Sequence, residues 1–232
     1  MNHFPNLADL NCFTEMNTFL SRLDTLGNSL DGDFGCDSIT KTIYSTDASV
    51  YKEEPIAVIW PKGLSDIRKI LLFAREEKSN VTIRAGGTSL AGQVVSSGII
   101  VDISRYMNKI IEINKEEMWV RVEPGVVLDE LNMKLKERGL FFGPETSTSN
   151  RCNIGGMVGN NACGSHSVIY GSTRDHTIEL KTLLSDGSEA TFGPVDNETF
   201  GAKCDLNNRE GNIYRNIKKI QEKQENKKSK KK

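Results

Sequence analysis

The sequence has no excess of charge of either sign and no long apolar run. It contains 30 Lys and Arg residues against 31 Asp and Glu residues, which gives a formal net charge of −1 at pH 7. Such a chain has no strong field to attract nucleic acid or an anionic membrane. No apolar run approaches the roughly 20 residues that cross a bilayer, and the N-terminus lacks the pattern of a signal peptide. We therefore expect a cytoplasmic protein with no transmembrane segment and no nucleic-acid partner.

Cysteine pairs at metal-ligand spacing are also absent. The 5 cysteines are scattered along the chain, and no C-x-x-C motif occurs. An odd, scattered set does not suit a disulfide framework, and it offers no ligand set for zinc or an iron–sulfur cluster. We expect reduced thiols and no metal site. The cysteines are Cys12, Cys36, Cys152, Cys163 and Cys204.

Two familiar nucleotide-binding motifs are missing as well. No G-x-G-x-x-G sequence occurs, which argues against an ordinary Rossmann dinucleotide site. Gly87 and Gly92 have the glycine spacing of a P-loop, but Gln93 and Val94 stand where that motif requires Lys and then Ser or Thr. A nucleotide triphosphatase is therefore not expected.

Formal charge is locally absent from two stretches, Ala85–Val101 and Cys152–Thr173, in a chain that is 26% charged. Both stretches are rich in glycine, which lets the backbone turn sharply and approach a ligand closely. We interpret them as walls against which a polar ligand lies, and a long flexible loop is the alternative for the second. Apolar residues are expected to anchor that second stretch in a core. They are Ile154, Met157, Val158, Val168 and Ile169.

The first neutral stretch begins as a glycine-rich turn, Ala85–Gln93, directly after an apolar segment that we expect to be a strand. Successive backbone N–H groups in such a turn can bind phosphate oxygens without help from Lys or Arg. The alternative is a tight turn with no further role.

Hydrophobic periodicity predicts a chain that mixes helices and strands. Helices are expected over residues 1–30, from Ser65 as the capping residue to 78, over 126–138, and over 212–220. Strands are expected over 55–61, 81–84 and 98–102, with hairpins over 110–122 and 177–192. An irregular, extended segment is expected over 44–51, and the lysines at 227–232 are expected to form a disordered, solvated tail.

Several motifs occur in order along the chain. They are TDAS at Thr46, P-x-A-V-x-x-P at Pro55, RAGGTSLAGQ at Arg84, EPG at Glu123, NIGGMVGNNACG at Asn153, YGSTRDH at Tyr170 and SDG at Ser185. With these motifs the chain resembles the FAD-binding domain of the vanillyl-alcohol oxidase and p-cresol methylhydroxylase (PCMH) type, over about residues 38–194. Within that group it is most similar to the FAD-linked 2-hydroxyacid dehydrogenases of the glycolate, D-lactate and D-2-hydroxyglutarate types.

The resemblance implies an α+β fold in which two α/β subdomains hold FAD between them. The corresponding boundaries are a helical extension over 1–33, an FAD-binding domain over 34–206 with subdomains at about 38–105 and 106–206, and a helix with a basic tail over 207–232.

The resemblance also implies a set of FAD-binding residues. The glycine-rich turn would hold the diphosphate through its backbone, and the second neutral stretch would line the diphosphate and the flavin. Relatives with covalently bound flavin often carry His at the position of Thr88, so noncovalent FAD is expected here. The residues are Ala85, Gly86, Gly87, Thr88, Ser89, Leu90, Gly92, Gln93, Pro144, Thr146, Ser147, Gly155, Gly156, Asn160, Asn161, Gly164, Tyr170, Gly171, Asp175 and, near the adenine, Ile178.

The activity implied by the resemblance is hydride transfer from the carbinol carbon of a 2-hydroxyacid to FAD, with electrons passed to a further acceptor. In the family, the substrate-binding residues lie C-terminal to the flavin domain, so we expect a missing domain or a separate subunit to supply them, and the catalytic residues stay unknown. Two alternatives are left open. One is an FAD-binding chain without activity of its own, and the other is a sugar-nucleotide reductase that uses NADPH.

Overall fold

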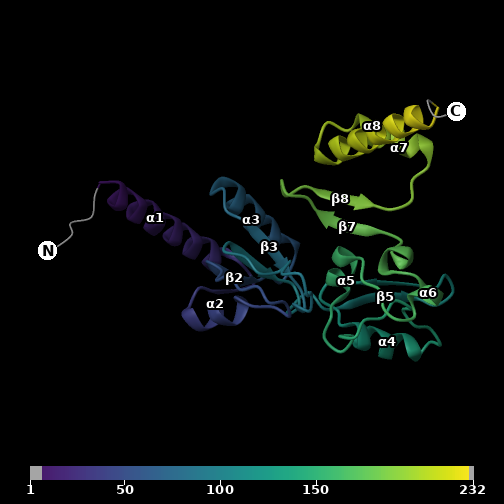
Figure 1. Ribbon diagram of the computed structural model, residues 1–232, viewed down its shortest axis with the longest axis horizontal. Coiled ribbons are helices and arrows are strands. Elements are labelled where there is room, and N and C mark those ends of the chain that lie inside the picture. Colours follow the sequence, from purple (N-terminus) through teal and green to yellow (C-terminus); the bar gives the residue numbers. More distant parts are fainter. Residues whose placement is uncertain (1–6, 230–232) are drawn as a thin grey trace. The chain divides into compact units, whose positions relative to one another are not determined.

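A computed structural model describes the backbone of residues 7–229 and the side chains of residues 17–224. The chain divides into two compact units, of which the first ends at Thr177 and the second begins at Ile178 (Figure 1). The last lysines of the predicted tail, and the side chains at the start of the predicted N-terminal helix, lie outside the described residues. The boundaries predicted for the FAD-binding subdomains are different from this division and stay a prediction.

The first part of unit one is a four-stranded sheet covered by helices. The strand order is β1-β2-β4-β3, in which β2, β4 and β3 run parallel and β1 is antiparallel to β2. The segments Ala57–Ile59 and Ile99–Val101 are fully buried, because helices α1 and α3 pack on this sheet through Leu23, Ile70 and their neighbours. The elements are α1 (Leu7–Ser29), β1 (Asp33–Gly35), α2 (Ser38–Tyr44), β2 (Ala57–Trp60), α3 (Leu64–Glu76), β3 (Val81–Arg84) and β4 (Ile99–Asp102).

A buried carboxylate joins the start of α3 to the turn before β1. The carboxylate of Asp66 is 1% exposed and accepts hydrogen bonds from the backbone N–H groups of Asp31, Gly32 and Lys62 at 3.0, 3.0 and 2.9 Å. The expected capping residue Ser65 is instead inside the first turn, and Gly63 is the N-cap without a side-chain hydrogen bond. The prediction of Ser65 as the capping residue was wrong, because the helix begins one residue earlier, at Leu64.

The second part of unit one forms around a hairpin and three helices. Its core contains Val126, Leu128, Leu131 and Met157. The predicted hairpin and the predicted helix after it are confirmed, and Gly139 has the positive φ of 72° that suits a helix C-terminus. The elements are β5 (Ile110–Asn114), β6 (Trp119–Val122), α4 (Leu128–Lys136), α5 (Ile154–Asn160), α6 (Ser167–Tyr170) and the 3₁₀ helix η1 (Thr173–His176).

The second neutral stretch is partly helical, and only its first half is anchored as expected. Ile154 and Met157 on α5 are buried, whereas Val168 and Ile169 on α6 are 97% and 74% exposed. Thr173 holds the second half instead, because it is fully buried and donates its hydroxyl to the Ala162 carbonyl at 2.6 Å. The expected anchoring by Val168 and Ile169 was therefore wrong, since a polar residue takes the buried position.

Three short elements were not predicted. Helix α2 begins at Asp37, whose carboxylate accepts hydrogen bonds from the N–H groups of Ile39 and Thr40 at 3.0 and 2.9 Å. This helix ends at Tyr44, which is the first residue of the segment that we expected to be extended. Strand β1 and helix α7 (Asn197–Asp205) were missed as well. Each is too short for its periodicity to stand out.

The second unit is a hairpin followed by two helices. The hairpin of β7 (Leu180–Leu183) and β8 (Glu189–Phe192) was predicted, and its register pairs Leu180 with Phe192. Helix α8 (Arg209–Ser229) is longer than the predicted helix at both ends. It includes residues 227–229, so the prediction of a disordered tail was wrong for these residues. Within the described part of the chain, no helix is long and apolar enough to cross a membrane.

Candidate functional site

The glycine-rich turn leaves the sheet at the end of β3 and is shaped by two glycines with positive φ. Gly87 and Gly92 have φ values of 61° and 70°, which L-residues with side chains rarely adopt. The carbonyl of Gly87 accepts a hydrogen bond from the Ala48 N–H at 3.1 Å. The ring of Tyr51 occupies the place where a side chain at position 92 would lie. The TDAS segment therefore packs directly on this turn.

The turn meets the second neutral stretch, or the residue directly before it, at three points. A Cβ atom at Gly86 would overlap the carbonyl oxygen of Arg151, and a Cβ atom at Gly156 would lie 3.2 Å from that of Ala85. Further along, the Gln93 amide donates to Asn160 Oδ1 at 3.0 Å. The fold thus brings together two neutral segments that are far apart in sequence.

The EPG motif explains how the second stretch is held in place. The N–H of Gly155 donates to the Pro124 carbonyl at 2.7 Å, and the N–H of Ile154 donates to the Val126 carbonyl at 2.9 Å. A Cβ atom at Gly155 would lie 2.5 Å from the Cβ of Pro124. The absence of a side chain at 155 is therefore needed for helix α5 to approach the EPG segment.

Asn153 has an unpaired polar atom at the point where the two stretches meet. Its Nδ2 donates to the Gly125 carbonyl at 2.7 Å, and this contact decides which end of the amide faces Gly86. The residue is 3% exposed, and its Oδ1 has no hydrogen-bond partner in the described part of the chain. A buried acceptor without a partner costs about 1–3 kcal/mol, so this atom fits a donor from a bound molecule.

Asp47 offers a second unpaired oxygen near the same turn. Its Oδ1 accepts from the Ser49 N–H at 2.8 Å, whereas its buried Oδ2 has no partner among the described residues. The neighbouring Ala48 bonds to Gly87, so this carboxylate belongs to the segment that covers the glycine-rich turn.

The end of α5 is tied back to η1. Asn161 ends the helix in the left-handed conformation, with φ of 46°, and its Oδ1 accepts from the Arg174 N–H at 2.9 Å. Asp175 accepts from both the N–H and the hydroxyl of Ser172 at 2.8 Å. The backbone hydrogen bond from Ser172 is the main reason why the pKa of Asp175 lies below its usual value. These contacts give Asn161 and Asp175 clear local structural roles.

Glu145 organises the turn that follows Cys163. Its carboxylate accepts hydrogen bonds from the Ser165 hydroxyl at 2.7 Å and from the His166 N–H at 3.2 Å, and it lies 2.6 Å from His166 Nδ1. The hydrogen bond from Ser165 lowers the pKa of Glu145 most. A Cβ atom at Gly164 would lie 2.5 Å from the Glu145 carbonyl oxygen. The Pro144–Ser147 segment is thereby fixed against Gly164.

Replacing Glu145 with alanine should loosen this turn without unfolding the unit. Ser165 would lose the acceptor of its hydroxyl and His166 the acceptor of its backbone N–H, so we expect the amide hydrogen of His166 to exchange faster by about tenfold or more. Hydrogen exchange followed by mass spectrometry measures this. Glu137→Ala is the control, because Glu137 is an exposed residue that pairs with the exposed Lys134, at 3.2 Å. Unchanged exchange in Glu145→Ala would show that the carboxylate does not hold the turn.

The predicted site residues are not all brought to one place. Close contacts join Ala85, Gly86 and Gln93 to the second stretch. Another contact joins Tyr170 to Gly143, because a Cβ atom at Gly143 would lie 3.0 Å from that of Tyr170. Leu90 is exposed, and the hydroxyl of Ser89 accepts from the Ala91 N–H at 3.4 Å. Thr146 contacts the sulfur of Cys152 at 3.1 Å. Ile178 is the first residue of the second unit, so its predicted place near the adenine stays a prediction.

Sequence reasoning missed Asn153, Asp47 and Glu145 as members of this region. Asn153 and Asp47 stand inside the quoted motifs NIGGMVGNNACG and TDAS, so the motifs contained the signal. Glu145 gave no signal, because its partners Ser165 and His166 are far away in sequence.

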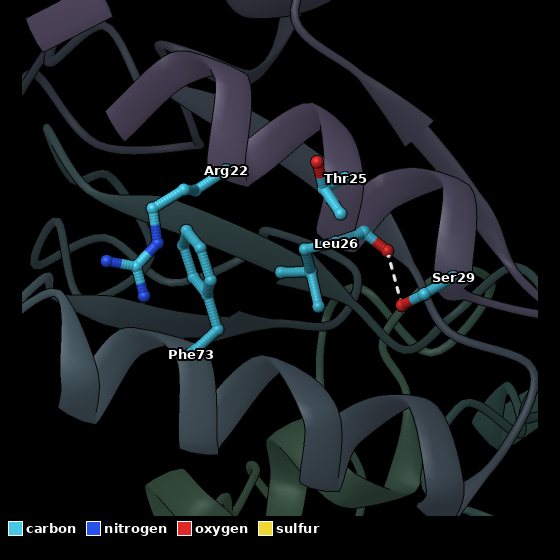
Figure 2. Close-up of a pocket in the computed structure, with 5 residues that line it drawn as sticks. All are labelled: Arg22, Thr25, Leu26, Ser29 and Phe73. Carbon is cyan, nitrogen blue, oxygen red and sulfur yellow. Dashed lines mark hydrogen bonds between the residues drawn. The ribbon is translucent and has the colours of Figure 1, made fainter. Parts of the chain in front are cut away.

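A small cavity lies elsewhere, between α1 and α3 (Figure 2). It has a volume of about 280 Å³ and is lined by Arg22, Thr25, Leu26, Ser29 and Phe73. Ser29 donates its hydroxyl to the Leu26 carbonyl at 2.7 Å, and Arg22 pairs with Glu77 at 2.6 Å. None of the predicted site residues lines this cavity, so we do not assign it a role.

The chain belongs to the family of FAD-binding domains, because the family's sequence pattern matches residues 55–193. Among curated relatives, D-2-hydroxyglutarate dehydrogenase of Pseudomonas putida is 40% identical over 222 residues, which are 94% of this chain and 22% of that protein. Glycolate oxidase subunit GlcD of Bacillus subtilis is 34% identical over 149 residues, which are 63% of this chain and 32% of that protein. The chain thus spans about a fifth to a third of the length of these relatives.

A solved structure shows the same fold. 6-hydroxy-D-nicotine oxidase from Arthrobacter nicotinovorans aligns with a TM-score of 0.63 at 20% identity, over 71% of this chain and 36% of that chain. At this identity the likeness concerns the fold alone. The predicted mixture of helices and strands in an FAD-binding fold of the PCMH type is confirmed.

The residues present fit FAD. At the meeting point of the two stretches, a side chain at Gly86 would collide with the backbone carbonyl of Arg151, so the backbone there is free of side chains and open to close approach. The meeting point also has an unpaired acceptor, Asn153 Oδ1, which suits a hydroxyl or imide N–H donor of the cofactor rather than a phosphate oxygen.

Proposed function

We propose that this chain binds FAD noncovalently where Ala85–Gln93 meets the Asn153–Gly164 segment. The observation that carries the proposal is the close approach of Gly86 to the carbonyl of Arg151 and to Asn153, whose Oδ1 has no hydrogen-bond partner among the described residues. The diphosphate would lie against the backbone N–H groups of the glycine-rich turn. Thr88 at the position where some relatives carry a flavin-linking His supports noncovalent binding.

The remaining residues are proposed to follow the cofactor along its length. Pro144, Thr146 and Ser147 would lie beside the dinucleotide, and Glu145 would keep them in place through its contacts to Ser165 and His166. Tyr170, Gly171 and Asp175 would close the site, and Ile178 would lie near the adenine. The second stretch would line the diphosphate and flavin through Gly155, Gly156, Asn160, Asn161 and Gly164.

We propose further that the FAD serves a dehydrogenase acting on 2-hydroxyacids. When bound, the flavin would accept a hydride from the carbon that carries the substrate hydroxyl. The contribution of the described residues is to bind and orient the cofactor. The groups that bind the hydroxyacid and take its proton would come from a further domain or a separate subunit, and a further acceptor would take the electrons. A cytoplasmic location is part of the same proposal.

The relatives suggest the order in which substrates should be tried. D-2-hydroxyglutarate comes first because the relative with that name matches 94% of this chain, whereas the glycolate oxidase subunit matches 63%. Loss of the oxidised-flavin absorbance band under anaerobic conditions would report reduction by D-2-hydroxyglutarate, D-lactate or glycolate. The expected result is reduction by one of these acids when the protein that contains this chain is assayed whole.

Two other results would contradict that activity. Reduction of the flavin by NADPH alone would favour a sugar-nucleotide reductase. A flavin that no hydroxyacid reduces in the whole protein would leave only cofactor binding. The expected result for this chain by itself is FAD binding with little or no reduction.

A further inference from the structure

The guanidinium group of Arg84 lies directly beside Gly87 in the glycine-rich turn. Arg84 is the last residue of β3 and the last charged residue before the first neutral stretch. Its Nη2 atom lies 2.8 Å from the position that a Cβ atom of Gly87 would take. The guanidinium therefore fills the space that the missing Gly87 side chain leaves.

This guanidinium is held by neutral groups. It lies 5.0 Å from the centre of the Tyr44 ring, and its Nη1 donates a hydrogen bond to the Tyr44 carbonyl at 3.3 Å. The carboxylate of Asp102, on the adjacent strand, is engaged by two hydroxyl groups. It accepts hydrogen bonds from the Tyr44 hydroxyl and the Ser104 hydroxyl, both at 2.6 Å. Burial and the hydrogen bond to Asp102 raise the pKa of Tyr44 to about 12, so the phenol stays protonated and neutral.

No carboxylate oxygen lies within 4.0 Å of the Arg84 nitrogens among the side chains that the structure describes. Arg105 offers a direct contrast. Its guanidinium also lies over aromatic rings, at 5.3 Å from both Trp60 and Tyr106, but it pairs with Asp33 at 3.0 Å. Arg84 thus makes no direct ion pair with a carboxylate of the described side chains, although Asp102 is its neighbour in the strand register.

An arginine has five N–H donors and cannot lose its charge in a protein. Arg84 uses one of these donors in a hydrogen bond to the protein. A partly buried cation with unused donors, next to a glycine-rich turn of the kind that binds anions through its backbone, favours a negatively charged ligand. The covering segment brings Asp47 near the same turn, yet Asp47 and Arg84 form no ion pair within 4.0 Å.

We propose that Arg84 is a positioning residue that compensates the charge of the cofactor diphosphate at the turn Ala85–Gln93. The inference rests on the proposed binding of FAD, and it extends that proposal beyond the backbone groups of the turn. The diphosphate is the part of FAD that carries formal negative charge, so Arg84 selects the dinucleotide over uncharged riboflavin.

The test compares variants that separate charge from packing. Arg84→Gln removes the charge but keeps a donor for the Tyr44 carbonyl, and Arg84→Lys keeps the charge. Arg105→Gln is the matched control. The dissociation constant for FAD is measured for each variant by flavin fluorescence at low and high salt.

We expect Arg84→Gln to weaken FAD binding by about 10- to 100-fold and to reduce its dependence on salt. Arg84→Lys should stay within about fivefold of the unchanged chain, and Arg105→Gln within about twofold. A structural role alone would weaken binding in Arg84→Gln while leaving the salt dependence as it is. That result, or FAD binding by Arg84→Gln within twofold of the unchanged chain, overturns the inference.

A second arm separates the inference from the function on which it rests. Inorganic pyrophosphate is titrated into the unchanged chain and into Arg84→Gln, and the shift of the melting temperature is recorded. If the unchanged chain binds no FAD, the proposed function fails. In that case a shift of the melting temperature with pyrophosphate that depends on Arg84 still supports the anion site. If pyrophosphate causes no such shift, the inference about Arg84 is overturned as well.

Discussion

Replacing Gly86 with alanine is expected to weaken FAD binding by about 10- to 100-fold, because overpacking of this kind costs about 1–3 kcal/mol. The added Cβ atom would overlap the carbonyl oxygen of Arg151, and it would come within 3.3 Å of Asn153 Oδ1. A backbone carbonyl cannot rotate away as a flexible side chain can. The two neutral stretches would have to separate, and the proposed FAD site between them would lose its shape.

Titration of the flavin-free chain with FAD, followed by fluorescence, measures this effect. Gly201→Ala is the control, because nothing lies within 4 Å of a Cβ atom at that position and Gly201 belongs to the second unit. It should bind FAD as the unchanged chain does. Tight FAD binding by Gly86→Ala would mean that the contact between the stretches does not form the binding site.

Replacing Asp66 with alanine is expected to destabilise the first unit by about 3–5 kcal/mol. Three backbone N–H groups, from Asp31, Gly32 and Lys62, would lose a buried charged acceptor. A hydrogen bond to a charged group contributes about 1.5–3 kcal/mol, and donors left unpaired in a buried place add to the loss. The turn before β1 and the start of α3 would come apart together.

Urea unfolding followed by circular dichroism gives the free energy of unfolding for this variant. Asp24→Ala is the control, since Asp24 is exposed on α1 and exposed substitutions usually change stability by less than about 0.5 kcal/mol. Equal unfolding midpoints for Asp66→Ala and the unchanged chain would show that this carboxylate does not hold the sheet to its helices.

Much of the fold could be predicted from the sequence because its strands are unusually clear. Ala57–Ile59 and Ile99–Val101 are apolar runs that parallel strands require when both of their faces are buried. Helix α2 was missed because it has only 7 residues and none of them is buried, so its capping residue Asp37 was the only local signal. Val168 and Ile169 were misjudged because apolar character alone does not tell an anchored residue from an exposed one.

The candidate site was predicted in its parts but not in its contacts. The two neutral, glycine-rich stretches can be recognised in the sequence, and the resemblance to FAD-binding domains supplied their roles. The collision that a side chain at Gly86 would have with Arg151 depends on how the chain folds back. The unpaired atoms of Asn153 and Asp47, and the unpaired charge of Arg84, likewise become visible only when all neighbours are in place.

The most direct measurement is the visible absorbance of the purified chain, followed by heat denaturation and identification of any released flavin. Oxidised-flavin bands, with FAD in the supernatant and a colourless precipitate, are the expected result of noncovalent binding between the two neutral stretches. A yellow precipitate would contradict noncovalent attachment and the interpretation of Thr88. A colourless chain that also takes up no added FAD would contradict the proposal that these residues form an FAD site in this chain.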